Sequence, residues 1–522
     1  MKYKVVIPSA GIGRRLGLHT KHINKGIVSI GDKPAICRVI DKFDDNLEII
    51  ILVGYKSEIL IEVVKQFYPS RKIKFVDVDK YEGEGSGLGY SLNKARKHLM
   101  QPFIFVPNDT LVGDEVIDLD PNLYGNWAAY YQVDSHEDVE QYRTLNIDND
   151  QVVNLNPKGI DNKNVYVGIC GIVDYEKFWD ALACEESQTV GESFGLNRLN
   201  NVKAVKLEQW YDTGSLKKLT EAKLKYKNVD VNILDKEDEA IWFNGKEVIK
   251  FNIDPKFIHD RVKRIYHLPN KMLPKLINSK KYTYKYTYIE GEVVASSFNS
   301  KSLIEFCDLC KKELWEVSEC NPDDYIKGLK EFYKDKTFSR VQHYYDRFEQ
   351  KDSNKIINGK DCLPVNKLLN NIDWKDLCEN NHISNFHGDL HGENIIKNHD
   401  NYLIIDWRQS FNGNVDFGDA YYDLAKLRHG LLVNHGMVDK NLYYCKELDN
   451  GIVNINIHQH SNLIEADKVF LEWLKTNKFS VKKVKILTAL IYLNVCGLHE
   501  FPYSKFLYYY GQYLLQDYLN EQ

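Results

Sequence analysis

His387-Gly-Asp-Leu-His-Gly-Glu-Asn394 is the stretch that decides how the second half of the chain folds. An apolar run follows it, Tyr402-Leu-Ile-Ile, and ends in Asp406 and Trp407. An Asp and an Asn five residues apart on a loop, with a second Asp at the end of a strand, are the groups that ATP-dependent phosphoryl transfer requires. We expect Asp389 to take the proton from an acceptor hydroxyl, and Asn394 and Asp406 to hold Mg²⁺ against the phosphates.

These residues resemble the catalytic loop and metal site of the aminoglycoside phosphotransferase and choline kinase family, a small-molecule branch of the protein-kinase-like fold. The family patterns HGDxHxxN, IDW and GDPxxDLA are met by residues 387–394, 405–407 and 418–425, with Ala420 in place of the usual Pro. The resemblance implies a two-lobed α+β kinase domain of EC 2.7.1 type that uses ATP and Mg²⁺.

The segment upstream of this loop predicts the small lobe of such a kinase. Residues 239–251 alternate as a hairpin that turns at Asn244-Gly245, a strong two-residue turn signal. By the resemblance, Lys250 stands where the fold places its phosphate-pairing lysine, and the segment around Glu290 resembles the strand and hinge that bind adenine. No Gly-rich loop precedes Lys250 and the next helix offers Asp260 but no Glu, so we expect an atypical nucleotide-binding lobe.

The beginning of the chain carries an independent phosphate site. A buried-type strand, Lys4-Val-Val-Ile-Pro-Ser, runs into Gly11-Ile-Gly13-Arg-Arg15, a turn whose backbone amides can approach a phosphate. Lys25 follows, and a second apolar strand at residues 102–106 leads to Asp109. Cations that neutralise a triphosphate and a carboxylate that holds a metal are the groups needed to move a nucleotidyl group.

This arrangement resembles the sugar-nucleotidyltransferase family over roughly the first 225 residues. Asn24 stands where the family has Pro, before its PK lysine. The resemblance implies an enzyme of EC 2.7.7 type with the following residues: Gly11 and Gly13 for the nucleotide phosphates, Arg15 and Lys25 for catalysis, Gly87 in the base-binding segment 83–92, and Asp109 with Asp212 of Trp210-Tyr-Asp-Thr-Gly214 for the metal.

Two further residues are candidates for binding the acceptor. The family places a lysine before a strand of small residues, and Lys158 precedes such a strand at residues 165–172. Glu192, which follows Gly191, stands where the family often has a carboxylate for acceptor hydroxyls.

Length and composition indicate an enzyme of two or three domains that acts on small molecules. A chain of 522 residues exceeds one core, and a formal net charge of -5 gives no broad attraction to nucleic acid. The chain enters a strand directly, without a signal peptide or a membrane-spanning apolar run, so we expect a cytoplasmic location. The ten cysteines have irregular spacing, and we interpret Cys307 and Cys310 as packing residues.

Strands and helices alternate through the first 106 residues, which predicts an α/β domain with a doubly wound, mostly parallel, Rossmann-like sheet. Ligands then belong at the carboxyl ends of the strands, where the Gly-rich turn and Asp109 fall. We expect a nucleotidyltransferase domain at residues 1–227 and a kinase-like domain at 228–522. The latter divides into a small antiparallel lobe at 228–298 and a helical lobe at 299–522.

The two sites can act in sequence. A kinase would phosphorylate choline, a polyol or a sugar, and the transferase would add an NMP, with CTP favoured over UTP, dTTP and GTP. The product would be an activated donor for capsule or other cell-surface polysaccharide, and a homo-oligomer is compatible with this function. Three alternatives stay open: an antibiotic-modifying phosphotransferase with a deep acidic pocket, fused to an unrelated transferase; a kinase-like module that only senses nucleotide; and a sugar kinase whose 1-phosphate product becomes a UDP- or dTDP-sugar.

Overall fold

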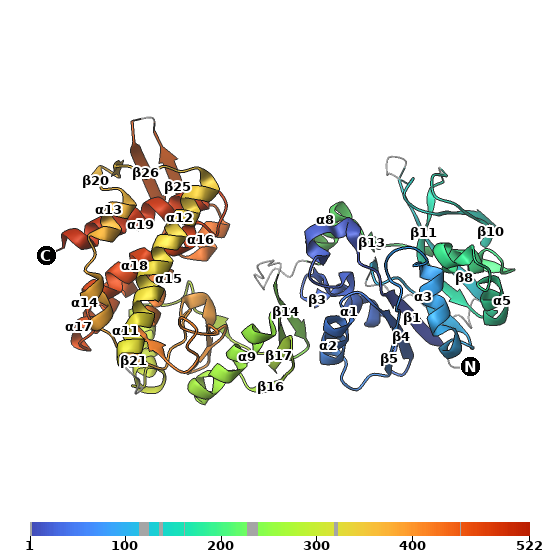
Figure 1. Cartoon of the computed structure of the whole chain (residues 1–522), viewed down its shortest axis with the longest axis horizontal. Coiled ribbons are helices and arrows are strands. Elements are labelled where there is room, and N and C mark those ends of the chain that lie inside the picture. The colour runs from blue at the N-terminus through green and yellow to red at the C-terminus, as the bar shows by residue number, and fades with distance from the viewer. Residues whose placement is uncertain are drawn as a thin grey trace. The chain divides into compact units, whose positions relative to one another are not determined.

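The computed structural model describes residues 3–113, 125–134, 139–160, 162–226, 238–317, 322–448 and 450–521. It forms two compact units (Figure 1). The first contains Met1–Pro255 and Ile277–Tyr286, and the second contains Lys256–Leu276 and Thr287–Gln522. The chain therefore passes between the units three times, and the expected boundary at residue 227 lies outside the described residues.

One edge of the first unit's sheet is parallel, as the sequence predicts. Four strands lie side by side in the order β5-β4-β1-β6: β1 Lys4–Ser9, β4 Glu48–Val53, β5 Ile73–Asp77 and β6 Phe103–Phe105. Helices α1 (Ala35–Ile40), α2 (Ser57–Phe67) and α3 (Leu88–Ala95) connect them, and α2 and α3 lie on opposite faces (Figure 1).

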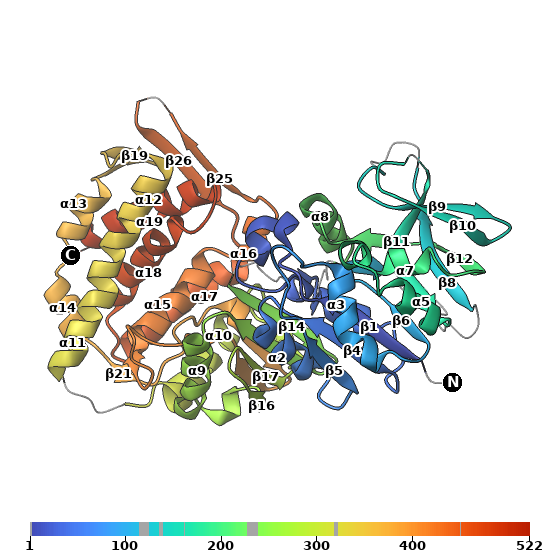
Figure 2. The ribbon, with the colours of Figure 1, turned by 45° about the vertical axis from the view of Figure 1, so that its right-hand side comes forward.

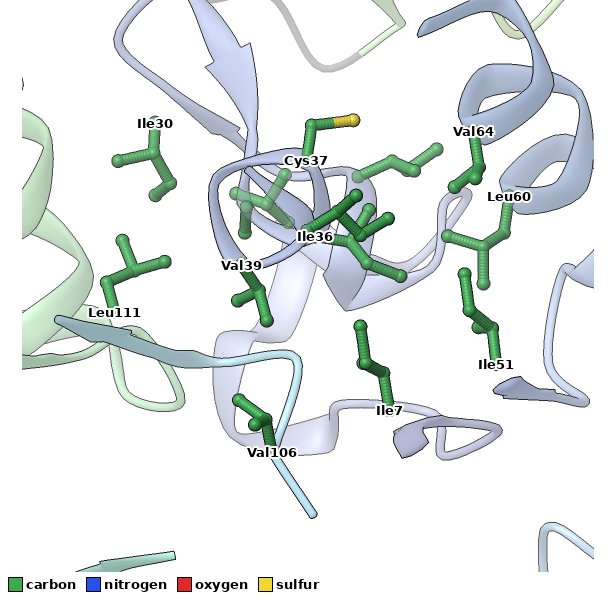
Figure 3. Close-up of a cluster of buried hydrophobic side chains, with 14 of the residues drawn as sticks. Ile7, Ile30, Ile36, Cys37, Val39, Ile51, Leu60, Val64, Val106 and Leu111 are labelled. Carbon is green, nitrogen blue, oxygen red and sulfur yellow. The ribbon is translucent and has the colours of Figure 1, made fainter. Parts of the chain in front are cut away.

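Alternation along these strands sends neighbouring side chains to opposite faces of the sheet. Ile7 and Ile51 pack with Ile36 of α1 and Leu60 of α2 in one core, where all four point toward one another (Figure 3). The intervening residues of the same strands, such as Ile50, join α3 in a second core. Both faces of the parallel strands are therefore buried, and their carboxyl ends remain for the loops that carry the candidate site.

The rest of the sheet is mixed, so the expectation of a mostly parallel sheet is correct for only one half. The order continues β11-β8-β12-β10-β9, and among these strands only β8 and β12 pair in parallel. The alternation that carried the prediction stops at residue 106, before these strands begin. Their bounds are β8 Asn126–Gln132, β9 Thr144–Asp148, β10 Gln151–Asn156, β11 Asn164–Ile172 and β12 Val202–Leu207.

The first unit contains shorter elements as well. A two-stranded sheet pairs β7 (Thr110–Val112) with β13 (Trp210–Asp212). The others are β2 Ser29–Ile30, β3 Lys33–Pro34, α5 Tyr175–Ala181, α6 Ser187–Val190, α7 Glu192–Leu196 and α8 Leu216–Lys225.

The strands expected for the small kinase lobe form a four-stranded sheet, β14-β15-β17-β16, that packs mainly within the first unit. Its strands are β14 Glu239–Asn244, β15 Glu247–Asn252, β16 Leu276–Ser279 and β17 Thr283–Thr287. Asn244 pairs with Glu247, so the hairpin loop is Gly245-Lys246, one residue later than predicted. Gly245 takes a positive φ of 59°, which glycine adopts without strain.

This small sheet is anchored on α2. Trp242 is fully buried, lies 5.4 Å from the ring of Phe251 and 6.1 Å from that of Phe67, and donates to the hydroxyl of Ser29 over 2.9 Å. The Glu62 carboxylate of α2 accepts bonds of 2.8 Å from the Tyr282 amide and from the Thr283 hydroxyl. The small sheet, which includes the strand with Lys250, is therefore fixed to α2 of the first unit.

The second unit is mostly helical, as predicted. Helix α18 packs against α12, α15 and α19 (Figure 2). The main helices are α9 Pro255–Arg264, α10 Ser300–Leu309, α11 Pro322–Lys330, α12 Lys336–Phe348, α13 Val365–Asn370, α14 Trp374–Glu379, α15 Ala420–Leu432, α16 His435–Asp439, α17 Ser461–Thr476, α18 Val481–Cys496 and α19 Tyr503–Asn520. Cys307 of α10 and Cys310 in the turn after it are both buried.

Short sheets accompany these helices, and of their strands the sequence analysis anticipated β23, which contains most of the apolar run before Asp406. Their strands are β18 Glu292–Val293, β19 Lys355–Ile357, β20 Lys360–Cys362, β21 Ile383–Ser384, β22 Ile395–Asn398, β23 Asn401–Ile404, β24 Gly418–Asp419, β25 Tyr443–Glu447 and β26 Ile452–Ile457. Most have two to four residues, too few for a clear alternation of apolar and polar positions. No helix in the described part of the chain is both long and apolar enough to cross a membrane.

Replacing Trp242 by Ala should destabilise the first unit by about 3–5 kcal/mol, because it removes the largest side chain between the small sheet and α2. Hydrogen exchange of the amides of β4, which pairs on both sides with β1 and β5, measures this loss. Leu224→Ala is the matched control, since Leu224 is 70% exposed on α8 and should change the free energy by less than about 0.5 kcal/mol. Equal effects of the two substitutions would contradict the anchoring role of Trp242.

Candidate active sites

The first candidate site contains two carboxylates, one in the loop between β6 and β7 and one at the end of β13. Asp109 directly precedes β7, and Asp212 ends β13, which pairs with β7 in antiparallel fashion. The amide of Thr213 donates to the carbonyl of Asp109 over 2.8 Å, which locks the two segments together. The Lys25 ammonium lies 2.8 Å from the Asp109 carboxylate.

Gly214 shows how closely the charged groups converge. A methyl group in place of its hydrogen would lie 2.9 Å from the Arg15 guanidinium and from Asp212, and 3.0 Å from the Asp109 carboxylate. Burial disfavours the charge of Asp109, but Lys25 and Arg15 outweigh it and lower the pKa of this carboxyl. The structure thus brings together the four charged residues that the sequence singled out here, with Asp109 ionised.

The loops around this group are held by side-chain bonds that the sequence did not reveal. Asn24 is fully buried and adopts an extended, proline-like backbone. Its amide donates to the carbonyls of Ser9 and Tyr55 over 2.7 and 2.9 Å, and its oxygen accepts from the Gly26 amide. Asn24 therefore links the end of β1 and the loop after β4 to Lys25.

The Tyr142 hydroxyl is a second contact that sequence reasoning missed. It donates to the Asp212 carboxylate over 2.7 Å, and its ring packs edge-on against Trp210 at 5.1 Å. This bond orients Asp212, whose other oxygen accepts from the Gly214 amide over 2.7 Å. The aromatic pair could not be found from spacing, because Tyr142 and Asp212 are far apart in the chain.

The three glycines predicted to contact the nucleotide lie in different structural environments. Gly13 adopts a left-handed φ of 73° and lies close to Lys25, so a side chain there would be strained and crowded. Gly11 is exposed, and nothing lies within 4 Å of the position a side chain would take. Gly87 begins α3, and a side chain there would come within 2.1 Å of the Gln188 carbonyl. Close packing alone thus explains Gly87, and its contact with a base remains a prediction.

The two predicted acceptor residues have contrasting environments. Lys158 is exposed in the turn that follows β10. Glu192 is buried at the start of α7, and burial raises the pKa of this carboxyl to about 7, although Arg143 favours its charge. A carboxyl that is half protonated near neutral pH can donate to an acceptor oxygen as well as accept from a hydroxyl.

The second candidate site is the loop between β21 and β22. The Asn394 amide donates to the backbone carbonyl of Asp389 over 2.9 Å and lies 3.4 Å from its carboxylate. Lys426 of α15 places its ammonium 2.7 Å from the other carboxylate oxygen. Burial disfavours the charge of Asp389, but Lys426 and His391 hold its pKa well below the ordinary value. Asp389 is therefore ionised and positioned from two sides.

A histidine and a glutamate of the same loop support Asp389. His391 lies 2.6 Å from the Glu393 carboxylate through one ring nitrogen and 3.5 Å from Asp389 through the other. Burial disfavours an imidazolium, but the two carboxylates outweigh it and raise the pKa of His391. His391 thus adds positive charge beside Asp389.

Backbone bonds join this loop to the segment that carries Asp406. The His387 ring bonds to the Ile405 carbonyl over 2.8 Å, and the Ile405 and Arg408 amides donate over 2.9 Å to the carbonyls of Asn394 and His387. Asp406 has a left-handed φ of 59°, unusual for a residue with a side chain. The metal-binding candidates Asn394 and Asp406 are thereby attached to one rigid frame.

Two basic residues of α9 also bond to this loop and to the segment of Asp406, in the helix that lacks the Glu of a typical kinase lobe. The Arg261 guanidinium pairs with the Asp406 carboxylate, and buried Arg264 donates to the carbonyls of Phe386 and Arg408. Asp260 pairs with Lys256 on the same helix. The signal that could have pointed to these contacts is the spacing of Arg261 and Arg264, which places both on one face of a helix.

Asp423 fixes the start of the loop. Its carboxylate accepts bonds of 2.7 and 2.6 Å from the His387 and Gly388 amides, and the Trp315 ring donates to it over 3.1 Å. Asp423 is fully buried, and burial raises its pKa to about 6 despite these three donors. Gly388 takes a φ of 86° there, which accounts for the glycine of the motif.

The structure places the two nucleotide-lobe candidates in different units. Lys250 is buried in β15 of the first unit, on the face opposite Ile249 and Phe251, which point into that unit's core. Glu290 is exposed in the second unit, between β17 and β18, and its backbone carbonyl accepts from Asn398 over 2.6 Å.

Each site offers oxygen ligands suited to Mg²⁺. Among the described residues, no three His, Cys, Asp or Glu side chains are arranged to hold a metal ion by themselves. Mg²⁺ at nucleotide sites is usually held by one or two protein carboxylates, with phosphate oxygens and water completing its shell. Asp109 with Asp212, and Asp406 with the amide oxygen of Asn394, fit that pattern.

Comparison with known proteins places the first half of the chain near the sugar nucleotidyltransferases, and no protein-family model matches. It is 27% identical over 256 residues to the "Bifunctional protein GlmU" of Methanococcus aeolicus, covering 47% of this chain and 60% of that protein. It is 27% identical over 172 residues to a D-glycero-alpha-D-manno-heptose 1-phosphate guanylyltransferase of Campylobacter jejuni, covering 31% and 75%. The match thus spans about three fifths of the first relative's length.

Among solved structures, the chain is similar to the CTP:phosphocholine cytidylyltransferase LicC of Streptococcus pneumoniae. The sequence identity is 20% and the TM-score 0.36, over 44% of this chain and all of that one.

The raised pKa of Glu192 predicts a pH-dependent stability. Its folded-state pKa of about 7 lies above the ordinary 4.5, so between these values the folded protein binds a proton that the unfolded chain has lost, and stability falls as pH rises. Glu192→Gln removes the titrating carboxyl and, with it, this decrease of stability with rising pH. Its unfolding free energy relative to the unsubstituted protein should therefore rise by about 2–3 kcal/mol from pH 4 to pH 8, measured by urea denaturation. Glu185→Gln, at an exposed position nearby, is the control. A difference that stays flat with pH would show that Glu192 is ionised in the folded protein.

Proposed function

We propose that the chain is a bifunctional enzyme. Its second half phosphorylates a hydroxyl of a small alcohol or sugar with ATP, and its first half transfers an NMP to the phosphorylated product and releases pyrophosphate. CTP is the NTP proposed first, and the product would serve as an activated donor for cell-surface polysaccharide or a related glycoconjugate. The observation that carries the proposal is the convergence of Arg15, Lys25, Asp109 and Asp212 around Gly214.

In the transferase reaction, a phosphate oxygen of the acceptor attacks the α-phosphorus of the NTP. A new P–O bond forms, the bond to pyrophosphate breaks, and negative charge accumulates on the leaving group. Arg15 and Lys25 supply fixed positive charge for this transition state. Mg²⁺ held by Asp109 and Asp212 would screen the phosphates further. Lys158 and Glu192 are proposed to bind the acceptor, and Gly11, Gly13 and Gly87 to admit the nucleotide.

In the kinase reaction, the acceptor oxygen attacks the γ-phosphorus of ATP. The bond to ADP breaks, and the hydroxyl proton passes to Asp389. A carboxylate with a low pKa is a weak base, so Asp389 mainly orients the hydroxyl and takes its proton late, as the new P–O bond forms. Asn394 and Asp406 would hold Mg²⁺, while Lys250 and the segment around Glu290 are proposed to bind ATP.

The names of the relatives bear on the choice of substrates. Two of them are a heptose 1-phosphate guanylyltransferase and a glucose-1-phosphate uridylyltransferase. They favour a second candidate, in which the acceptor is a sugar 1-phosphate and the nucleotide is GTP or UTP. An assay with CTP, UTP, GTP and dTTP, each combined with phosphorylated sugars and alcohols, decides between the two.

Asp109→Ala should lower pyrophosphate release by a factor on the order of 10³, because it removes a metal ligand and leaves Lys25 without its partner. The measurement is pyrophosphate formation from the best NTP and phosphorylated acceptor. ADP formation by the kinase half should not change. Asp45→Ala, at a carboxylate that is 91% exposed, should behave like the unsubstituted protein. Pyrophosphate release that survives in Asp109→Ala would remove Asp109 from the metal site.

Asp389→Asn should lower ADP formation by a factor on the order of 10³, because an amide keeps the shape of the side chain but cannot accept the proton. ADP release in the presence of acceptor is the readout, and pyrophosphate release from an acceptor already phosphorylated serves as the internal control. Asp400→Asn, on the exposed turn between β22 and β23, is the matched variant. Unchanged ADP formation in Asp389→Asn would refute the assignment of the base.

A further inference from the structure

Four basic side chains, one of which contacts Asp389, act on one another in this part of the second unit, and we refer to them as the basic cluster: Lys336, Arg340, Arg408 and Lys426. Lys426 contacts the carboxylate directly over 2.7 Å. Lys336 and Arg408 lie over the ring of Phe332, at 4.0 and 5.1 Å from its centre. Arg340 lies one helical turn beyond Lys336 on α12, and its positive charge lowers the pKa of Lys336.

The charges that act most strongly on Lys336 are mainly positive. Asp389 favours the charge of Lys336, while Arg408, Lys426 and Arg340 all oppose it. Burial and these like charges lower the pKa of Lys336 to about 6. With this pKa Lys336 is mostly uncharged near neutral pH, and an anion bound beside it would restore its charge and offset the repulsion among the other basic groups. The arrangement is therefore suited to a negatively charged ligand.

The two carboxylate oxygens of Asp389 have different partners, and this difference shows on which side of Asp389 Lys426 lies. One oxygen lies 3.4 Å from the Asn394 amide and 3.5 Å from His391. The other is bonded to Lys426. Asn394 is the proposed ligand of the metal on ATP, so Lys426 of the basic cluster marks the other oxygen as the side from which the acceptor hydroxyl can approach without displacing the ATP phosphates.

We infer that the acceptor of the kinase half carries an anionic group of its own, a phosphate monoester or a carboxylate, which the basic cluster binds while Asp389 orients the hydroxyl. This inference rests on the proposed kinase function and names its substrate class. The anionic group is unchanged in the reaction, since the γ-phosphoryl group goes to the hydroxyl oxygen, the proton goes to Asp389 and ADP leaves. A cationic acceptor, such as choline or an aminoglycoside, does not fit a site of this charge.

The test measures ADP release by the full chain with ATP, Mg²⁺ and acceptors in matched sets: glycerol, glycerol 3-phosphate and glycerate; glucose, glucose 6-phosphate and glucuronate; and choline. We expect an anionic member to exceed its neutral counterpart at least about 100-fold in kcat/KM, the size expected when a charged group gains or loses its buried partners. The phosphate and carboxylate members show which anion is used. A neutral acceptor or choline that performs equally well overturns the inference and leaves the kinase function standing. ADP release with none of them removes both.

Single substitutions test which basic side chains bind the anionic group of the acceptor. Lys336→Gln and Arg340→Gln should each raise KM for the anionic acceptor about tenfold or more, with KM for ATP changed less than about twofold. Lys334→Gln, just before α12 and outside the cluster, is the matched control and should change neither constant. An increase in KM for ATP rather than for the acceptor would show that the cluster binds the nucleotide, and would overturn the inference. Asp389→Asn separates the two roles, because it should lower kcat with every acceptor.

Discussion

The pairing of a carboxylate with a basic side chain is the interaction on which both candidate sites depend. Lys25 holds Asp109 in one unit, and Lys426 holds Asp389 in the other, at 2.8 and 2.7 Å. Such pairs keep the carboxylates ionised inside the protein, where burial alone would protonate them. They also keep the basic groups in position before a phosphate arrives, so little reorganisation is needed when charge moves during the reaction.

Bonds from side chains to backbone keep these pairs in place. Asn24 ties two loops of the first unit together, and Asp423 accepts the amides at the start of the loop that carries Asp389. Neither side chain belongs to the proposed chemistry. Both are fully buried, with each bond satisfied by a specific partner, which is the condition under which buried polar groups rigidify a site.

Local signals made part of this structure predictable. Strands β1 and β4 and helix α2 follow apolar periodicities, and residues 387–394 contain Asp389, Asn394 and their loop in one stretch. The mixed half of the first sheet was missed in large part because pairings such as β6 with β11 and β8 with β12 join distant segments. Arg261 and Lys336 were missed for the same reason: a basic residue on a helix is ordinary until the fold brings it to a carboxylate or to other cations.

The position of the small sheet has a consequence for how such a two-part gene could arise or be divided. Trp242, Ile249 and Phe251 of the small sheet are buried in the core of the first unit. Separating the small sheet from the rest of the first unit would expose apolar surface on both parts, and both would be prone to aggregate. A division of the gene just before β14 would therefore break the core of the first unit and would not separate two independent domains.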